Sequence, residues 1–167
     1  MEPLVDPAED VGLLCQVVAA ATSDRVVRQL TEAGFDDVRA SHGFIFQGLL
    51  AGDTTITALA QRLGVSAQAV SKTVIELEQA GYLERRRDDH DGRARIIALT
   101  ERATAMLALS RRSRLAVAEE IAAALGERDS RKLARLLRAV AEQYGGMEAI
   151  SARRVRPMDG LDLTSTS

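Results

Sequence analysis

The sequence predicts a mainly α-helical fold with a small β-hairpin: a winged helix-turn-helix flanked by long helices. Three observations support this prediction. Aromatic residues make up only 3% of the 167 residues, which favours a core of aliphatic and alanine side chains in closely packed helices. Apolar residues recur at helical spacing along most of the chain. Residues 82–99 change to a strand-like pattern interrupted by a polar turn.

The first two helices are expected within residues 9–52. Residues 9–33 contain no proline and repeat apolar side chains at helical spacing, and Gly34 can end this helix. After a short polar link, Ser41 is expected to begin a second apolar helix, which Gly52 ends.

Two shorter helices follow with the spacing of a helix-turn-helix. Thr55 and Thr57 are both candidate N-caps of the first helix, and Gly64 suits its C-terminal end. Ser66 is the candidate N-cap of the second helix, which Gly81 ends. One face of this second helix is apolar and is expected to pack on the first.

The remaining elements are a hairpin and two long helices. Tyr82–Arg87 and Arg95–Leu99 can pair as strands around a tip rich in aspartate. Thr100 is expected to cap a helix that runs to about Leu125, and a last helix spans about 127–144 with one apolar face. The flanking helices are too long and too apolar for one small winged domain, so we expect them to pack against a second copy of the chain.

Composition and charge exclude several protein classes. A single cysteine cannot form an intramolecular disulfide, and no apolar run approaches the roughly 18 residues that span a membrane. The acidic N-terminus lacks the basic region of a signal peptide, so a cytoplasmic protein with no membrane partner is expected. The net charge of −2 gives no basic average of the kind typical of nucleic-acid-binding domains. The positions of individual arginines therefore matter more than the total.

The outer face of helix 66–80 has the side chains expected of a DNA-reading helix. It holds hydrogen-bonding groups, one cation, one aliphatic residue and no acid. Glutamine can pair with adenine, serine and lysine can reach bases or phosphates, and isoleucine can touch a thymine methyl. A plain solvated face is the alternative, and the face alone does not exclude it. With the helix cap included, the candidates are Ser66, Gln68, Ser71, Lys72 and Ile75.

The predicted wing carries five arginines beside its acidic tip. Such arginines can enter a minor groove or bind phosphates, whereas a self-neutralised surface loop is the alternative. Asp91 is two residues from Arg93 and can orient it through a charge-assisted hydrogen bond. Together with the helix-turn-helix, this pattern favours DNA binding. The arginines are Arg85, Arg86, Arg87, Arg93 and Arg95.

Residues 54–100 resemble the winged helix-turn-helix of the MarR family of bacterial transcription regulators. The flanking helices extend the resemblance over residues 9–144. The family usually has a glycine where this chain has Ala103, and alanine suits a helix better. The stretches that carry the resemblance are Thr57–Ser66, Gly81–Arg85 and the wing signature Asp91–Thr100, which ends in Leu-Thr.

The resemblance implies a homodimer, joined by its terminal helices, that binds an inverted repeat in double-stranded DNA. Each recognition helix 66–80 would enter a major groove, and each wing 85–95 would reach a minor groove. It also implies a repressor that is released by a small phenolic or lipophilic effector or by an oxidant. The expected organisation is an N-terminal extension (1–8), helices for dimerisation and a ligand pocket (9–52), the DNA-binding lobe (53–100), C-terminal dimerisation helices (101–144) and a flexible tail (145–167).

Cys15 is a candidate redox sensor, because one branch of the family senses organic peroxides with a cysteine in this region. In that branch tyrosines support the thiol, whereas the tyrosines of this chain, Tyr82 and Tyr144, lie in later segments. The neighbours of Cys15 are apolar. A buried, unreactive thiol is therefore expected, with redox sensing as the alternative.

An effector pocket is expected where the first, second and fifth helices meet the lobe. Arg39, His42 and Phe46 are candidate lining residues, although ordinary core packing explains a phenylalanine equally well. His42 and His90 are far apart in the sequence, so neither a metal site nor a cofactor is expected.

Two other function classes remain as alternatives. A winged helix can serve protein assembly instead of DNA binding, but the wing arginines count against this. An enzyme is not expected, because the sequence has no glycine-rich phosphate loop, no metal-ligand cluster and no nucleophile–base pattern.

Overall fold

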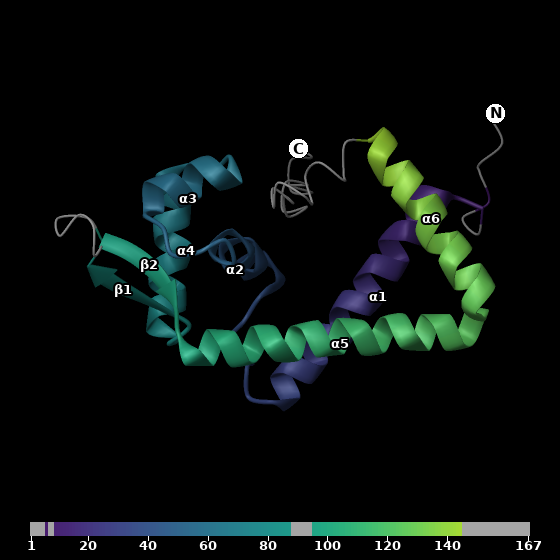
Figure 1. Cartoon of the computed structure of the whole chain (residues 1–167), viewed down its shortest axis with the longest axis horizontal. Coiled ribbons are helices and arrows are strands. Elements are labelled where there is room, and N and C mark those ends of the chain that lie inside the picture. The colour runs from purple at the N-terminus through teal and green to yellow at the C-terminus, as the bar shows by residue number, and fades with distance from the viewer. Residues whose placement is uncertain (1–5, 7–8, 88–94, 145–167) are drawn as a thin grey trace, which may run out of the picture.

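The computed structural model describes residue 6 and residues 9–87 and 95–144. Figure 1 shows helix α5 (Glu101–Leu125) as a long rod with a small lobe at one end and helix α6 (Glu127–Gln143) at the other. Helix α1 (Val11–Glu32) crosses α5 and packs against it. The predicted class, mainly helical with one small hairpin in a winged helix-turn-helix, is confirmed.

Helix α1 begins and ends close to its predicted limits. The Asp10 carboxylate caps it by accepting the Leu13 N–H at 3.0 Å, and Gly34, with φ of 84°, follows its end. Only Val26 and Leu30 are buried in this helix. Its first half therefore presents apolar side chains that find no cover within the described chain.

The second predicted helix is shorter than expected. Residues Ala40–His42 form a single 3-10 turn, and α2 spans only Gly43–Leu49. The His42 side chain explains the difference, because its ring Nδ1 accepts the Arg39 N–H at 3.2 Å, while the backbone N–H of His42 donates to the Arg39 carbonyl at 3.0 Å. These two bonds close a tight turn before the helix begins, so the expectation that Ser41 opens the helix is wrong.

The helix-turn-helix consists of α3 (Ile56–Leu63) and α4 (Ala67–Gln79). Thr55 caps α3 by accepting the Ala58 N–H at 3.2 Å, which decides between the two candidate threonines. Ser66 caps α4 in the same way, through the Ala69 N–H at 3.2 Å. Gly64 between the helices has φ of 68°, a conformation that glycine adopts without strain.

The wing is an antiparallel pair of strands, β1 (Leu83–Arg87) and β2 (Arg95–Leu99). Thr54 adds a short bridge to Ile97, which the sequence did not predict; the two N–H···O bonds measure 2.8 and 3.3 Å. This bridge ties the segment just before α3 to β2, which therefore lies between Thr54 and β1. The tip of the wing lies outside the described residues.

The hydrophobic core lies in the lobe and extends to the adjoining parts of α1 and α5. Ala103, which stands where the MarR family usually has a glycine, is fully buried, and its N–H donates to the Thr100 hydroxyl at 3.2 Å. A methyl group at this position therefore fits the core. The largest fully buried side chains belong to Phe46, Leu59, Val70, Val74, Leu77, Tyr82 and Ile97.

A second group of apolar side chains is exposed on α1 and α6. We call it the outer apolar surface. Helix α6 has no buried residue although one of its faces is apolar, as predicted. No described helix is long and apolar enough to cross a membrane. The outer apolar surface comprises Val11, Leu14, Val17 and Val18 on α1 and Leu133, Leu136, Leu137, Val140 and Tyr144 at α6.

Candidate nucleic-acid interface

The outer face of α4 has the composition that the sequence predicted. Val70, Val74 and Leu77 are buried on the inner face. On the outer face Gln68 and Lys72 are exposed, Ile75 is 44% exposed, and Ser71 is partly buried. The structure therefore presents these candidates to solvent together, while Ser66 stands at the N-terminus of the same helix as its cap.

The carboxylates of α4 are engaged beside this face. Glu78 accepts two hydrogen bonds from Arg85 at 3.0 and 3.1 Å, which joins the base of the wing to α4. Glu76 lies 3.8 Å from the buried Nε2 of His42. Arg85 is thus a structural residue of the lobe, and the negative charge near the outer face of α4 is partly neutralised.

The wing places two arginines directly opposite each other. Arg87 pairs with Arg95 in the strand register, and both are exposed. Like charges at such a pair destabilise a hairpin, and a bound anion between them would remove this cost. Within residues 9–87 and 95–144 neither arginine forms an ion pair. Together the guanidinium groups of Arg87 and Arg95 form a positively charged site that suits a phosphate.

The other predicted wing residues differ in their surroundings. Arg86 is exposed and donates to Glu84 on the same strand, with its Nε 2.8 Å from the carboxylate. Exposed pairs of this kind contribute about 0–1 kcal/mol, so a phosphate can compete for Arg86. Arg93 and Asp91 lie outside the described residues.

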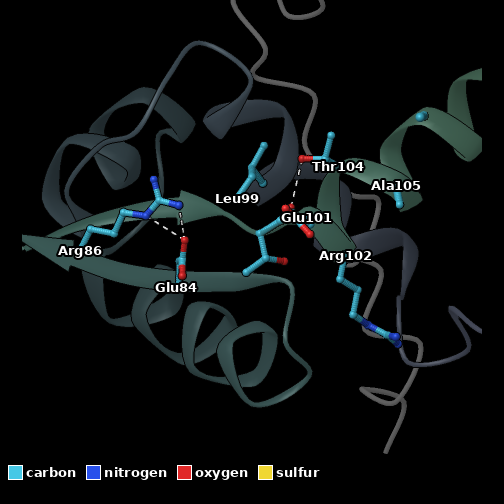
Figure 2. Close-up of a pocket in the computed structure, with 9 residues that line it drawn as sticks. Glu84, Arg86, Leu99, Glu101, Arg102, Thr104 and Ala105 are labelled. Atoms are coloured by element: carbon cyan, nitrogen blue, oxygen red, sulfur yellow. Dashed lines mark hydrogen bonds and ion pairs between the residues drawn. The ribbon is translucent and has the colours of Figure 1, made fainter.

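A groove of about 760 Å³ runs beside the wing and the first turns of α5. Figure 2 shows the Glu84–Arg86 pair on one side and Glu101 at the centre, while the Arg102 side chain points away from that pair. The two carboxylates in this groove, Glu84 and Glu101, balance the charge of Arg86 and Arg102, so the groove has no excess of positive charge for DNA. Exposed positive groups of the lobe lie instead at Arg87 and Arg95 on the wing and at Lys72 on α4.

Three residues that the sequence analysis did not select meet where the lobe joins α5. We call Asp37, Tyr82 and Arg102 the junction cluster. The Tyr82 hydroxyl donates to Asp37, and Arg102 donates to Asp37 at 3.3 Å and to the Tyr82 oxygen at 3.1 Å. The Arg102 guanidinium also lies over the Tyr82 ring, 4.7 Å from its centre, and over the Phe35 ring at 5.4 Å.

The cluster shifts the ionisation of its members. Burial and the Asp37 carboxylate raise the pKa of Tyr82 to about 12, so its hydroxyl stays a donor throughout the physiological range. Partial burial acts to raise the pKa of Asp37, but the Tyr82 hydrogen bond and the Arg102 charge outweigh it and the pKa is lowered. Asp37 therefore remains an acceptor for both partners at neutral pH.

An apolar cavity of about 780 Å³ lies between α1, α2 and α5. Two of the three predicted lining residues, Arg39 and Phe46, contribute to it, whereas His42 does not. Phe46 is only 2% exposed and also contacts the Tyr82 ring edge-on at 5.9 Å, so it serves the core as well. Four arginines line this cavity and none of its lining residues is acidic: Arg39, Arg111, Arg112 and Arg114.

His42 is buried in the turn that precedes α2. Burial lowers the pKa of His42 because it disfavours the charged ring, and the nearby Arg39 charge acts in the same direction. The neutral ring then accepts the Arg39 N–H through Nδ1 and carries its proton on Nε2, toward Glu76. His42 is thus a structural link between the turn and α4.

Cys15 is exposed, so the expectation of a buried thiol is wrong for the single chain. The apolar residues around it belong to the first half of α1, which has no partner in the chain, and apolar neighbours in sequence do not by themselves provide cover. No group of three or more histidine, cysteine, aspartate or glutamate side chains suited to a metal occurs among the described residues.

Comparison with known proteins supports the interpretation of the lobe. Residues 48–94 match the sequence profile of the MarR family. No curated protein matches the chain.

Solved structures share the fold over most of the chain. The transcriptional regulator Tm0710 from Thermotoga maritima is 25% identical, with a TM-score of 0.57, and the match covers 78% of this chain and 93% of that one. RV1404 from Mycobacterium tuberculosis is 24% identical, with a TM-score of 0.68 over 85% and 95% of the two chains. The PcaV transcriptional regulator from Streptomyces coelicolor, solved with its natural ligand, is 21% identical, with a TM-score of 0.51 over 84% and 98%.

Proposed function

We propose that the chain, whose residues 48–94 match the sequence profile of the MarR family, acts as a homodimeric repressor that binds an inverted-repeat operator and is released from it by a small effector. The observation that carries this proposal is the surface of the lobe. An acid-free outer face of α4 and the opposed pair Arg87–Arg95 are both exposed on it.

Each part of this surface has a distinct role in the proposal. The outer face of α4 enters a major groove, where Gln68, Ser71 and Ile75 meet base edges and Lys72 reaches a base or phosphate. The wing follows the DNA backbone toward a minor groove, with Arg86, Arg87 and Arg95 binding phosphates. Ser66 contributes through the N-terminus of α4, whose free N–H groups favour an anion.

The outer apolar surface supports a dimer. Leu136 is 52% exposed and Tyr144 81% exposed in the single chain, on a face whose neighbours are also apolar. Burial of such a face against a second copy would remove this surface from water and give the two-fold symmetry that an inverted repeat requires. The two α4 helices would then lie about 34–36 Å apart.

The cavity between α1, α2 and α5 is the proposed effector site. Its apolar wall and four arginines favour a small hydrophobic molecule that carries a negative charge. PcaV, which has the same fold, was solved with its natural ligand. An effector here would contact α1, α2 and α5, beside the point where α5 joins the lobe, and it would release DNA by changing the distance between the two lobes of the dimer.

The proposal is tested by selecting duplex fragments from genomic DNA with the purified protein and following binding against salt. We expect a shared inverted repeat and an affinity that falls steeply as salt rises, because bound arginines displace counterions. No enrichment by the folded protein would contradict DNA binding and would favour the protein-assembly alternative.

Arg95→Ala tests the wing directly. If Arg95 binds a phosphate, the variant should weaken binding to all duplexes and reduce the slope of log affinity against log salt by about one unit. Arg131→Ala is the matched control, because Arg131 is an exposed arginine on α6. An unchanged slope in Arg95→Ala would remove Arg95 from the interface.

A further inference from the structure

The junction cluster connects three parts of the chain that are distant in sequence. Asp37 lies in the connection between α1 and α2, Tyr82 lies between α4 and the wing, and Arg102 lies in the first turn of α5. In Figure 1 the lobe meets the rod of α5 at this end. The cluster is therefore located where any rotation of the lobe relative to α1 and α5 would occur.

The bonding of the cluster leaves little rotational freedom. Tyr82 is fully buried, and its ring contacts Phe46 and Phe35 at centroid distances of 5.9 and 6.4 Å. Arg102 is held by the faces of two rings and by three acceptors, the third being the Gly34 carbonyl at 3.3 Å. A planar guanidinium held on both its face and its edge allows few alternative geometries.

A second set of contacts lies beside the cluster and gives the lobe a fixed pivot. The Thr100 hydroxyl donates to the Gly81 carbonyl at 2.7 Å, and the Thr100 N–H donates to the Tyr82 carbonyl at 3.1 Å. These bonds hold the start of α5 close to the end of α4, but a single pivot still permits rotation. The side chains of the junction cluster add contacts that oppose this rotation of the lobe about the start of α5.

From this geometry we infer that Asp37, Tyr82 and Arg102 are positioning residues that set the angle between α4 and α5 and so select the half-site spacing that the dimer accepts. The inference rests on the proposed function and adds a determinant of specificity outside the DNA-contacting surface. None of the three residues needs to touch DNA for this role.

Tyr82→Phe is the main test, because it keeps the ring and removes only the hydroxyl. The wild type and the variant are compared on duplexes that carry the selected inverted repeat with its spacer lengthened or shortened by single base pairs, and on a duplex with one half-site. Arg102→Gln and Arg102→Lys are measured in the same way, the latter as the conservative rescue. Arg25→Gln, which breaks the exposed Arg25–Glu120 pair between α1 and α5, is the matched control.

We expect the wild type and Arg25→Gln to prefer one spacing sharply. Tyr82→Phe and Arg102→Gln should lose about fivefold or more of that preference, while their affinity for the single half-site stays within about twofold of wild type. Arg102→Lys, which keeps the charge beside Asp37, should recover part of the preference.

Two results would overturn the inference alone. One is a wild-type spacing profile in Tyr82→Phe and Arg102→Gln; the other is a loss of half-site affinity as large as the loss on the full repeat, which would indicate a damaged lobe. If the wild-type protein itself selects no repeat, the proposed function fails and the inference fails with it.

Discussion

Gln68 illustrates how much a single side chain can contribute to recognition. It is exposed on the outer face of α4, two residues after the N-terminal cap Ser66, and an amide can donate to and accept from the same adenine edge. In the proposed complex, phosphate contacts from the charged wing arginines would add affinity for any duplex. We expect the uncharged groups on the outer face of α4 to contribute to sequence preference.

Gln68→Ala should therefore relax sequence preference without changing the salt dependence. We expect a loss of about 1–3 kcal/mol on the selected operator and little change on unrelated duplexes. Gln61→Ala is the control, because Gln61 is an exposed glutamine on α3. Competition binding with base-substituted operators measures the effect. An equal loss on every duplex would assign Gln68 to the phosphate contacts.

Two features of individual residues could not be predicted from the sequence. Cys15 was expected to be buried because its neighbours are apolar, but burial depends on what packs over them, and no element of the described chain does. The junction cluster was missed because Asp37 and Arg102 are 65 residues apart and belong to no periodic pattern. Contacts of this kind arise only when the elements are packed.

At the scale of elements, the limits of most helices follow from local chemistry that the sequence displays. Thr55, Ser66 and Thr100 each accept an N–H from three residues further on, and the sequence analysis selected each of them as a candidate cap. The turn at Ala40–His42 differs because the acceptor of its hydrogen bond is the ring of His42, and histidine is not a common capping residue. The bridge from Thr54 to Ile97 involves only one residue of the segment before α3, so no repeating sequence pattern indicates it.

The contact between α2 and α3 allows no added volume. A Cβ at Gly48 would lie 2.4 Å from Cδ1 of Leu59, which is fully buried, whereas a Cβ at Gly43 would meet no atom within 4 Å. Gly48→Ala should therefore lower the free energy of unfolding by about 1–3 kcal/mol, measured by urea denaturation.

Gly43→Ala on the same helix is the matched control for this packing prediction. It should leave stability unchanged or raise it by about 0.5–1 kcal/mol, because alanine restricts the unfolded chain. If both variants behaved alike, close packing at Gly48 would not be the cause.

In the whole molecule, the lobe has a buried core, whereas α6 and the first half of α1 have apolar faces that no described part of the chain covers. Nearly all of the buried core belongs to the lobe and to the parts of α1 and α5 that adjoin it, while α6 buries nothing. An amphipathic helix is stabilised mainly by packing of its apolar face. We therefore expect α6 to depend on a second copy for its stability.

Leu136→Glu tests this dependence. A buried leucine contributes about 1.5–3 kcal/mol, and two-fold symmetry doubles the effect, so the dimer dissociation constant should rise at least about a hundredfold. Arg135→Glu, a charge change at the adjacent exposed position, is the control and should remain dimeric. Sedimentation velocity separates the two species. A Leu136→Glu protein that remains a dimer at the same concentration would exclude α6 from the interface.

The length of α5 has a mechanical consequence. Its 25 residues extend about 37 Å, so a rotation of about 5° at one end displaces the other by about 3 Å. Stacked base pairs are about 3.4 Å apart. In the proposed dimer, a small rotation of α5 would therefore displace one lobe relative to the operator by nearly the height of one base pair. An effector would not need to open the protein to abolish binding, because a slight tilt of α5 would produce this mismatch.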